Sequence, residues 1–196
     1  MRIIGSVGEP LNVEAWHWYH RQIGKNKCPI VDTWWQTETG GILIAPQKNL
    51  AAKPGFVGQP LPGILPAILD AKGKEITHSG VQGALCLKKP WPGLALTILG
   101  NKRKFLKTYF SQYQGYYYSG DVATRDRDGG YRIFGRLDDV VNVSGHRIGC
   151  AEIENIVALH PDAVEAAAVS CRHAIKGESI YVFLVPRNDR SDADVF

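Results

Sequence analysis

The stretch Ile30-Val-Asp-Thr-Trp-Trp-Gln-Thr-Glu-Thr-Gly-Gly-Ile-Leu-Ile-Ala45 carries two apolar runs on either side of a polar turn. This pattern predicts a strand over 30–35, a tight loop over 36–41 and a second strand over 42–45. Successive side chains of a strand point to opposite faces, so one of Trp34 and Trp35 is expected in the core and the other at the wall of a cavity. The threonine hydroxyls and the Glu38 carboxylate come after the tryptophans. These groups are suited to binding phosphates and Mg²⁺.

Outward from this stretch, the periodicity predicts alternating helices and strands. Helices are expected between the N-cap Asn12 and Gly24, over 101–110, and over 151–160 before Pro161. Residues 53–100 mix Pro and Gly with short apolar runs and are expected to be β-rich. Further strands are expected at 116–118, 131–136, 140–143, 146–148, 164–171 and 179–185. The fold class predicted is therefore α/β, in the mixed α+β sense.

Composition narrows the classes of protein. With 196 residues, 44% hydrophobic and 21% charged, the chain is long enough for one or two packed units. A net charge of +4 is well below the positive charge density of proteins that cover nucleic acids. No apolar run approaches the roughly 18 residues that a membrane-spanning helix needs. The four cysteines lack a C-x-x-C spacing, which favours reduced thiols and a cytoplasmic location. We expect neither nucleic acid nor a membrane as partner, and the composition favours no other partner by itself.

Three further stretches place glycines and charged residues in loops, where ligands commonly bind. Gly5-Ser-Val-Gly-Glu-Pro10 allows close approach of a flat ring or a phosphate, or forms a plain structural turn. Tyr118-Ser-Gly-Asp121 ends on a carboxylate that can accept both hydroxyls of a ribose, although a turn residue is the alternative. Gly135-Arg-Leu-Asp-Asp-Val-Val-Asn-Val-Ser-Gly-His-Arg-Ile-Gly149 brings two guanidiniums to a hairpin, a pattern suited to phosphate recognition.

Three of these stretches, at 32–41, 118–121 and 135–149, resemble in their order and separations the adenylate-forming superfamily of acyl-CoA ligases, nonribosomal adenylation domains and luciferases. Within it, the double Trp and Val143-Ser-Gly-His-Arg147 are most similar to the AMP-forming acetyl-CoA synthetase family. The resemblance implies a ligase that makes acetyl-AMP and pyrophosphate from ATP and acetate, then transfers the acetyl group to coenzyme A, with Mg²⁺ as cofactor.

The resemblance also implies roles for individual positions. Val7 and Trp35 would line a short acetate pocket, and Ser144 and Gly145 would contact coenzyme A. Arg147 would act on the phosphates during adenylation, and Asp138 would be the hinge on which a small domain rotates between the two steps. The positions implied to bind ATP or AMP are Gly8, Glu9, Pro10, Asp32, Thr33, Trp34, Trp35, Gln36, Thr37, Asp121, Arg136 and Arg147.

Two metal sites follow from the same resemblance. Glu38 would lie near the Mg²⁺ of the nucleotide. A second Mg²⁺ site would lie at the end of the helix carrying His160, where Ala158 and Ala163 offer backbone carbonyls. For His160 a plain role at the helix terminus is the alternative.

By the same resemblance, residues 1–137 are the C-terminal part of a large AMP-binding domain with a β-rich subdomain. Residues 138–196 are the hinge and the start of a small α/β C-terminal domain. The family's phosphate loop and catalytic lysine have no counterpart in the sequence, so the chain is expected to be a fragment, inactive alone and prone to self-association. The alternatives are another acyl-CoA ligase or adenylation enzyme, and a nucleotide-binding or inert product of a broken gene.

Overall fold

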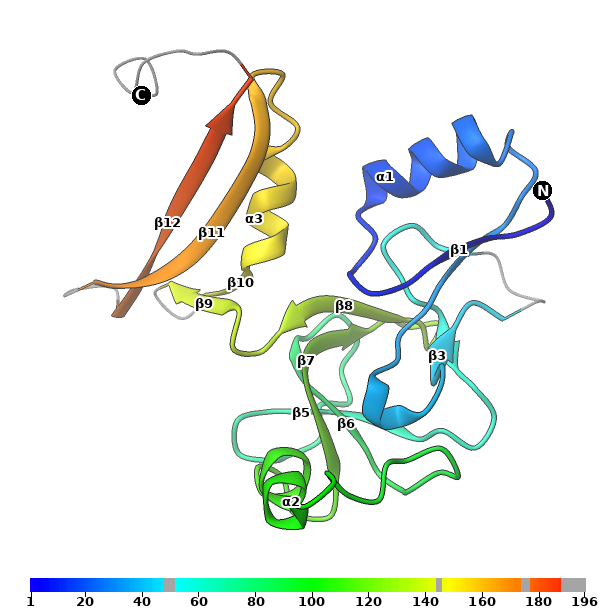
Figure 1. Cartoon of the computed structure of the whole chain (residues 1–196), viewed down its shortest axis with the longest axis vertical. Coiled ribbons are helices and arrows are strands. Elements are labelled where there is room, and N and C mark those ends of the chain that lie inside the picture. The colour runs from blue at the N-terminus through cyan, green and yellow to red at the C-terminus, as the bar shows by residue number, and fades with distance from the viewer. Residues whose placement is uncertain (48–51, 144–145, 174–176, 188–196) are drawn as a thin grey trace. The chain divides into compact units, whose positions relative to one another are not determined.

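The chain divides into two compact units, Met1–Ile133 and Phe134–Phe196. The computed structural model describes residues 1–47, 52–143, 146–173 and 177–187. Both units contain helices and strands, so the predicted mixed α/β class is confirmed (Figure 1).

The first unit begins with a small parallel sheet. Its elements are β1 (Ile4–Ser6), α1 (Val13–Trp18), the π-helical turn η1 (Tyr19–Ile23) and β2 (Ile30–Asp32). Strands β1 and β2 pair in parallel with Ser6 opposite Asp32. As predicted, Asn12 caps α1, and its Oδ1 accepts the N–H of Ala15 at 2.6 Å. The predicted helix ends at Gly24 as expected, but its second half is the wider π-turn.

The rest of the first unit is β-rich, as the Pro and Gly pattern predicts. Its elements are the 3₁₀ turn η2 (Thr37–Thr39), β3 (Ile44–Ala45), β4 (Gln59–Pro60), β5 (Pro66–Leu69), β6 (Gly83–Leu87), α2 (Lys102–Phe110), β7 (Tyr117–Arg125) and β8 (Tyr131–Arg136), the last of which continues into the second unit. One two-stranded sheet joins β3 to β4, and a four-stranded sheet has the order β5-β6-β7-β8. The strand predicted over 30–35 is shorter than expected, because after Asp32 only Trp34 pairs, in a bridge to Ile44.

The larger of two apolar clusters described in the first unit includes a residue of the double-Trp stretch. Trp34, Ile44, Leu85, Tyr117 and Ile133 are among its buried members, and they come from five separate segments of the chain. Burial of such side chains stabilises by about 1.5–3 kcal/mol each relative to exposure. The cluster therefore fixes segments that lie far apart in the sequence relative to one another.

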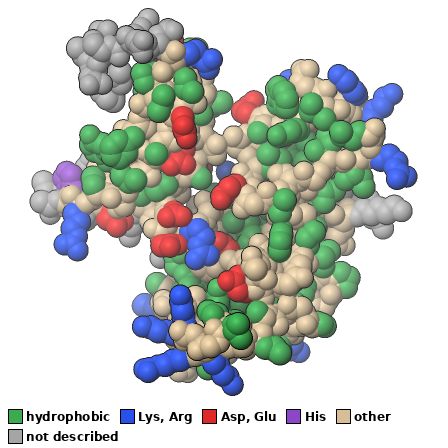
Figure 2. All heavy atoms as spheres, viewed as in Figure 1, with side chains coloured by type: hydrophobic (Ala, Val, Ile, Leu, Met, Phe, Trp, Pro, Cys, Tyr) green, Lys and Arg blue, Asp and Glu red, His purple; other side chains and the backbone are tan. Residues whose placement is uncertain are grey.

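Helix α2 packs on β7 and presents its charges to solvent. Asn101 caps it, with its Oδ1 accepting the N–H of Lys104 at 2.9 Å, and Phe105 is buried on its inner side. The cations of Lys102, Arg103, Lys104 and Lys107 are exposed, and Figure 2 shows Lys and Arg side chains gathered over this end of the unit. The charged stretch 102–104 is a solvated helix face, as its pattern indicates.

The second unit combines one helix with a four-stranded sheet. Its elements are β9 (Val140–Val143), β10 (His146–Gly149), α3 (Cys150–Val157), β11 (Ala163–His173) and β12 (Gly177–Pro186), with the sheet order β10-β9-β12-β11 (Figure 1). Glu154 ties α3 to β11, because its Oε1 accepts the N–H of Ala168 at 2.9 Å. The elements predicted between residues 140 and 185 are all present, with ends that differ by a few residues. Within the described part of the chain, no helix has both the length and the apolar character needed to cross a membrane.

All four cysteines are free thiols, as predicted. Cys28 and Cys86 are buried, and burial raises the pKa of Cys86 to about 12. A thiol with so high a pKa stays protonated at neutral pH and acts as a small apolar core residue.

Candidate functional site

The buried carboxylate of Asp121 is the centre of the candidate site. Its Oδ2 accepts two hydrogen bonds, one from the indole Nε1 of Trp34 at 2.9 Å and one from the amide Nε2 of Gln36 at 3.1 Å. Both donors belong to the double-Trp stretch. The structure thus brings together two motifs that the sequence singled out separately.

Asp121 lies inside β7 and not in the loop predicted after residue 118, and an irregularity in this strand places it. The register between β6 and β7 shifts between Ala84 and Cys86, so that three residues of β7, including Gly120 with φ +83°, lie opposite Leu85 alone. Ser119 fixes this bulge, since its hydroxyl lies 2.8 Å from the carbonyl of Leu85 and accepts the N–H of Asp121 at 3.0 Å. Bulges of this kind re-aim side chains and occur often beside active sites. The Ser-Gly sequence before Asp121 is therefore what turns the carboxylate toward Trp34.

The loop after the two tryptophans is held from several sides. Thr39 closes the 3₁₀ turn η2, and its Oγ1 accepts the N–H of Gln36 at 3.0 Å. The indole of Trp91 donates to the carbonyl of Thr39 at 2.8 Å. Gly40 has φ +70°, and a Cβ at this position would lie 2.2 Å from the carbonyl oxygen of Gly93. Glycine at position 40 is thus required by backbone conformation and by close approach together.

The parallel pair β1–β2 brings the first stretch beside the second. The N–H of Thr33 donates to the carbonyl of Ser6 at 3.2 Å, so the loop carrying Val7, Gly8, Glu9 and Pro10 starts where β2 ends. Gly8 has φ +107°, a conformation that favours glycine. Ligands of open α/β sheets commonly bind outside the carboxyl ends of parallel strands.

Asp32 lies at this end with an unusual ionisation. Burial raises the pKa of its carboxyl to about 6, against the lowering effect of hydrogen bonds from the backbone N–H groups of Thr33 and Leu11. The group is therefore a carboxylate at neutral pH that takes up a proton in mildly acidic solution.

The two neighbouring tryptophans have opposite environments, as strand geometry predicts. Trp34 is 6% exposed and belongs to the apolar core cluster, whereas Trp35 is 41% exposed. Val7 is 60% exposed. The acyl pocket assigned to Trp35 and Val7 stays a prediction.

Glu38 is oriented by an aromatic side chain that the sequence did not point to. Its Oε1 accepts a hydrogen bond from the hydroxyl of Tyr109 on α2, and its backbone carbonyl accepts the N–H of Ala95 at 2.8 Å. Among residues 1–47, 52–143, 146–173 and 177–187, no three His, Cys, Asp or Glu side chains gather into a metal-binding group. Because Mg²⁺ is commonly held by one or two carboxylates together with substrate phosphates, a lone Glu38 fits that kind of site.

The remaining candidates belong to the second unit. Arg136 Nε lies 3.4 Å from Oδ1 of Asp138, and both side chains are largely exposed. In β10, Arg147 pairs with Asn142 through the backbone register, while Ser144 and Gly145 lie outside the described residues. The hinge role of Asp138 stays a prediction. The first compact unit ends at Ile133 and the second begins at Phe134, four positions before Asp138 in the sequence.

The positions proposed for a second Mg²⁺ site lie after the helix rather than on it. Helix α3 ends at Val157 with Ala158 as its C-cap, so His160 stands in the turn that follows. Its Nδ1 accepts the N–H of Asp162 at 3.3 Å, and the backbone N–H of Ala163 donates to the carbonyl of His160 at 3.0 Å. These contacts are those of a helix-terminating turn, the alternative that the sequence left open.

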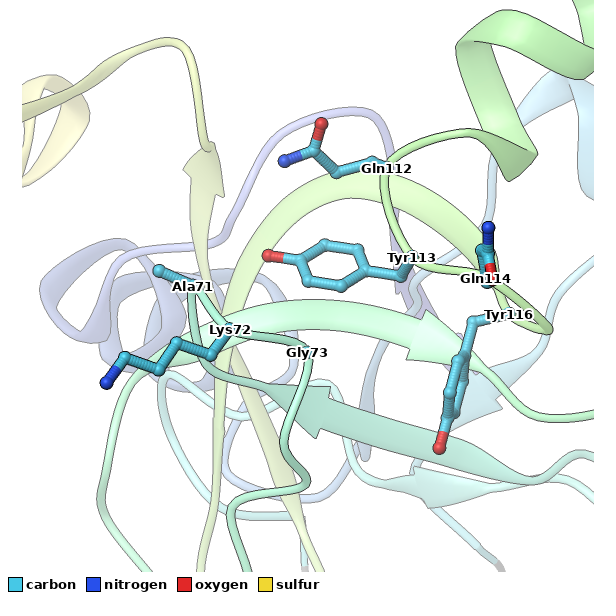
Figure 3. A pocket seen from close by; sticks show the side chains of 7 residues that line it. All are labelled: Ala71, Lys72, Gly73, Gln112, Tyr113, Gln114 and Tyr116. Carbon is cyan, nitrogen blue, oxygen red and sulfur yellow. The ribbon is translucent and has the colours of Figure 1, made fainter.

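A cavity of about 270 Å³ lies elsewhere in the first unit (Figure 3). It lies between the turn after β5 and the loop after α2, and none of the candidate site residues lines it. Its walls are formed by Ala71, Lys72, Gly73, Gln112, Tyr113, Gln114 and Tyr116.

Two tyrosines at the site were not predicted from the sequence. Tyr117 lies in β7 four residues before Asp121, and the bulge at 119–121 interrupts the alternation of sides along the strand, so no simple pattern placed it beside Gln36. Tyr109 lies on a helix that the sequence predicted as a basic surface helix, with Phe105, Leu106 and Tyr109 on one side and no role at the site. No local pattern links it to Glu38, 71 residues earlier.

Known proteins are similar to this chain over nearly its whole length. The family model described as AMP-binding enzyme matches residues 1–97, and the model described as AMP-binding enzyme C-terminal domain matches residues 152–195. The chain is 51% identical to an acetyl-coenzyme A synthetase of Syntrophus aciditrophicus over 99% of its own length and 30% of that protein. It is 48% identical to the human acetyl-coenzyme A synthetase 2-like, mitochondrial, over 100% of the chain and 29% of the relative.

A third relative, acetyl-coenzyme A synthetase 2 of Pseudomonas aeruginosa, is 52% identical over 94% of the chain and 28% of the relative. The chain thus spans about three-tenths of the length of the curated relatives it matches. The two family models occur in chain order, and the first covers the loops that bear the double Trp. On these grounds the chain belongs to the family of AMP-binding enzymes.

Proposed function

We propose that this chain provides the nucleotide-side and acyl-side residues of an acetyl-CoA synthetase. The observation that carries the proposal is the buried Asp121 carboxylate held by Trp34 and Gln36. The similarity of nearly the whole chain to proteins named acetyl-coenzyme A synthetase supports the choice of reaction.

The first step joins acetate to the nucleotide. A carboxylate oxygen of acetate attacks the α-phosphorus of ATP, the bond from that phosphorus to the bridging oxygen breaks, and pyrophosphate leaves. Asp121 accepts hydrogen bonds from the ribose hydroxyls and so fixes the α-phosphate relative to the acyl pocket. Arg136 and Arg147 neutralise phosphate charge, which is the main catalytic requirement of such a transfer.

The second step transfers the acetyl group to coenzyme A. The thiolate of coenzyme A attacks the carbonyl carbon of acetyl-AMP, and the bond to the phosphate oxygen breaks to release AMP. Ser144 and Gly145 contact coenzyme A, and rotation at Asp138 exchanges the faces used in the two steps. Glu38 would hold Mg²⁺ together with the nucleotide phosphates, and the bound ion would supply charge neutralisation.

The bulk of Trp35 sets the acyl specificity. A filled pocket excludes longer acids, whereas the gain or loss of one methylene contact changes binding by only about 1–3 kcal/mol. This favours acetate over the longer substrates of other acyl-CoA ligases. The partners proposed are acetate, ATP and coenzyme A, and the free thiols support a cytoplasmic location.

A segment exchange tests this function. The 196 residues replace the matching segment of the Syntrophus aciditrophicus relative, and acetate-dependent pyrophosphate release and acetyl-CoA formation are measured. We expect turnover with acetate, and a loss of about 10- to 100-fold in kcat/KM for ATP in Asp121→Asn because a charge-assisted contact is removed. A folded exchange protein with no pyrophosphate release contradicts the proposal.

A further inference from the structure

Two tyrosines from distant segments form a parallel stack beside the candidate site. The rings of Tyr109 on α2 and Tyr117 on β7 have centroids 5.3 Å apart and an interplanar angle of 6°. Each hydroxyl donates to a different side chain of the loop after the tryptophans. Tyr117 donates to Gln36, and Tyr109 donates to Glu38.

The contact from Tyr117 fixes which way the Gln36 amide faces. The hydroxyl donates to Oε1 of Gln36 at 2.9 Å, so Nε2 is directed to the other side. There Nε2 donates to the carbonyl of Ser119 at 2.7 Å and to Oδ2 of Asp121 at 3.1 Å. A flipped amide would turn its carbonyl oxygen toward these two acceptors. The Tyr117 hydroxyl therefore acts on Asp121 through Gln36.

Other aromatic side chains hold the stack in place. Trp91 and Phe110 make edge contacts with the Tyr117 ring, at centroid distances of 5.4 and 5.8 Å. Phe105 packs against the Tyr109 ring at 5.3 Å. Because such rings pack closely in the core cluster, neither hydroxyl can move away without loss of several contacts.

We infer that Tyr109 and Tyr117 are positioning residues for nucleotide binding, and this rests on the proposed function. Tyr117 orients Gln36 and, through Gln36, the Asp121 carboxylate that accepts hydrogen bonds from the ribose hydroxyls. Tyr109 orients Glu38, the carboxylate that would hold Mg²⁺ together with the nucleotide phosphates. Each tyrosine acts through a side chain of the loop, and the stacked rings hold the two tyrosines against each other.

Ribose discrimination tests the part played by Tyr117. Calorimetry of the full chain measures its affinity for AMP and for 2′,3′-dideoxy-AMP. The second nucleotide lacks the ribose hydroxyls that are proposed to donate hydrogen bonds to Asp121. We expect Tyr117→Phe to weaken AMP binding about 3- to 10-fold, the worth of one buried hydrogen bond, and to leave the dideoxy nucleotide within about twofold. A merely structural role would weaken both nucleotides equally.

Tyr118→Phe is the matched control. It removes a hydroxyl from the next residue of β7, whose ring packs with Tyr113 in a different cluster. We expect its ratio of AMP to dideoxy-AMP affinity to equal that of the unaltered chain.

Metal dependence of ATP binding tests Tyr109. We expect Tyr109→Phe to reduce the factor by which Mg²⁺ strengthens ATP binding, and to leave the AMP to dideoxy-AMP ratio unchanged. The readout is a binding ratio measured with Mg²⁺ and with a chelator.

The outcomes separate the two proposals. If the unaltered chain binds AMP no better than dideoxy-AMP, the proposed function fails and this inference with it. If the unaltered chain discriminates and Tyr117→Phe keeps the full ratio, the positioning role alone is overturned. Exchange of the Gln36 side-chain amide protons, followed by NMR without nucleotide, gives a further check: unchanged exchange in Tyr117→Phe also overturns it.

Discussion

Trp34 and Asp121 stand 87 positions apart in the sequence, and the indole N–H of Trp34 donates to the Asp121 carboxylate at 2.9 Å. Both side chains are buried. A buried carboxylate needs strong hydrogen-bond donors, and an indole N–H combines a donor with a large apolar surface. One residue of the double Trp thus serves the core and the candidate site together.

Trp34→Phe should lower the free energy of unfolding by about 2 kcal/mol, because a charge-assisted hydrogen bond to a buried carboxylate is lost. Urea denaturation followed by circular dichroism measures the change. Trp35→Phe is the control, and since Trp35 is 41% exposed we expect a change within about 0.5 kcal/mol. Equal losses in the two variants would contradict the assigned role of the indole contact.

Trp35→Gly in the exchange protein should open the acyl pocket to longer acids. Removal of the indole leaves space for several methylenes, each able to gain about 0.8 kcal/mol from burial. Pyrophosphate release with acetate, propionate and butyrate measures the shift in kcat/KM. An unchanged order of preference would remove Trp35 from the acyl pocket.

Asp32→Asn should change how stability depends on pH. The pKa of Asp32 is about 6 in the folded state and near 3.8 when unfolded, so between these values the folded state binds more protons. The free energy of unfolding therefore falls as pH rises from about 4 to 6. The free energy of unfolding of Asp32→Asn, relative to that of the unaltered chain, should therefore increase over this pH range. Urea unfolding midpoints at several pH values measure this change. A constant difference would mean that Asp32 has an ordinary pKa.

Gly40→Ala should be much more destabilising than Gly63→Ala. Both glycines have positive φ, at +70° and +86°, and a left-handed conformation costs a residue with a Cβ about 1–2 kcal/mol. At Gly40 the new Cβ would also meet the Gly93 carbonyl, whereas nothing lies within 4 Å at Gly63. We expect Gly40→Ala to lose about 1–3 kcal/mol more, from overpacking, in thermal or urea unfolding. Similar losses would refute the close approach.

Much of the fold could be predicted from local pattern. Asn12 and Asn101 cap their helices because the polar side chain satisfies a free backbone N–H, which needs only neighbouring residues. The strand 131–136 has the predicted bounds, since it follows a turn in which Asp126 accepts the N–H groups of Asp128 and Gly130. The second half of the first helix was predicted less well, because the π-turn at 19–23 changes the spacing within a pattern that is still amphipathic.

Like the fold, the candidate site could be predicted only in part from the sequence. The motifs and their glycines were visible because backbone conformation limits which residue types can occupy a turn. The partners of those motifs were not, because Tyr109 reaches Glu38 only after α2 packs on β7. The raised pKa of Asp32 also follows from burial, which no short stretch of sequence reveals.

The sequence by itself determined the helices, most of the strands, the opposite environments of Trp34 and Trp35, and the candidate residues for nucleotide chemistry. These features depend on neighbours along the chain and on strand alternation. Tertiary structure alone decided that Trp34 and Gln36 would hold Asp121 and that a stack of Tyr109 and Tyr117 would orient Gln36 and Glu38. Hydrogen bonds and ring contacts between segments depend on how the apolar core brings those segments together, and that packing is a property of the whole unit.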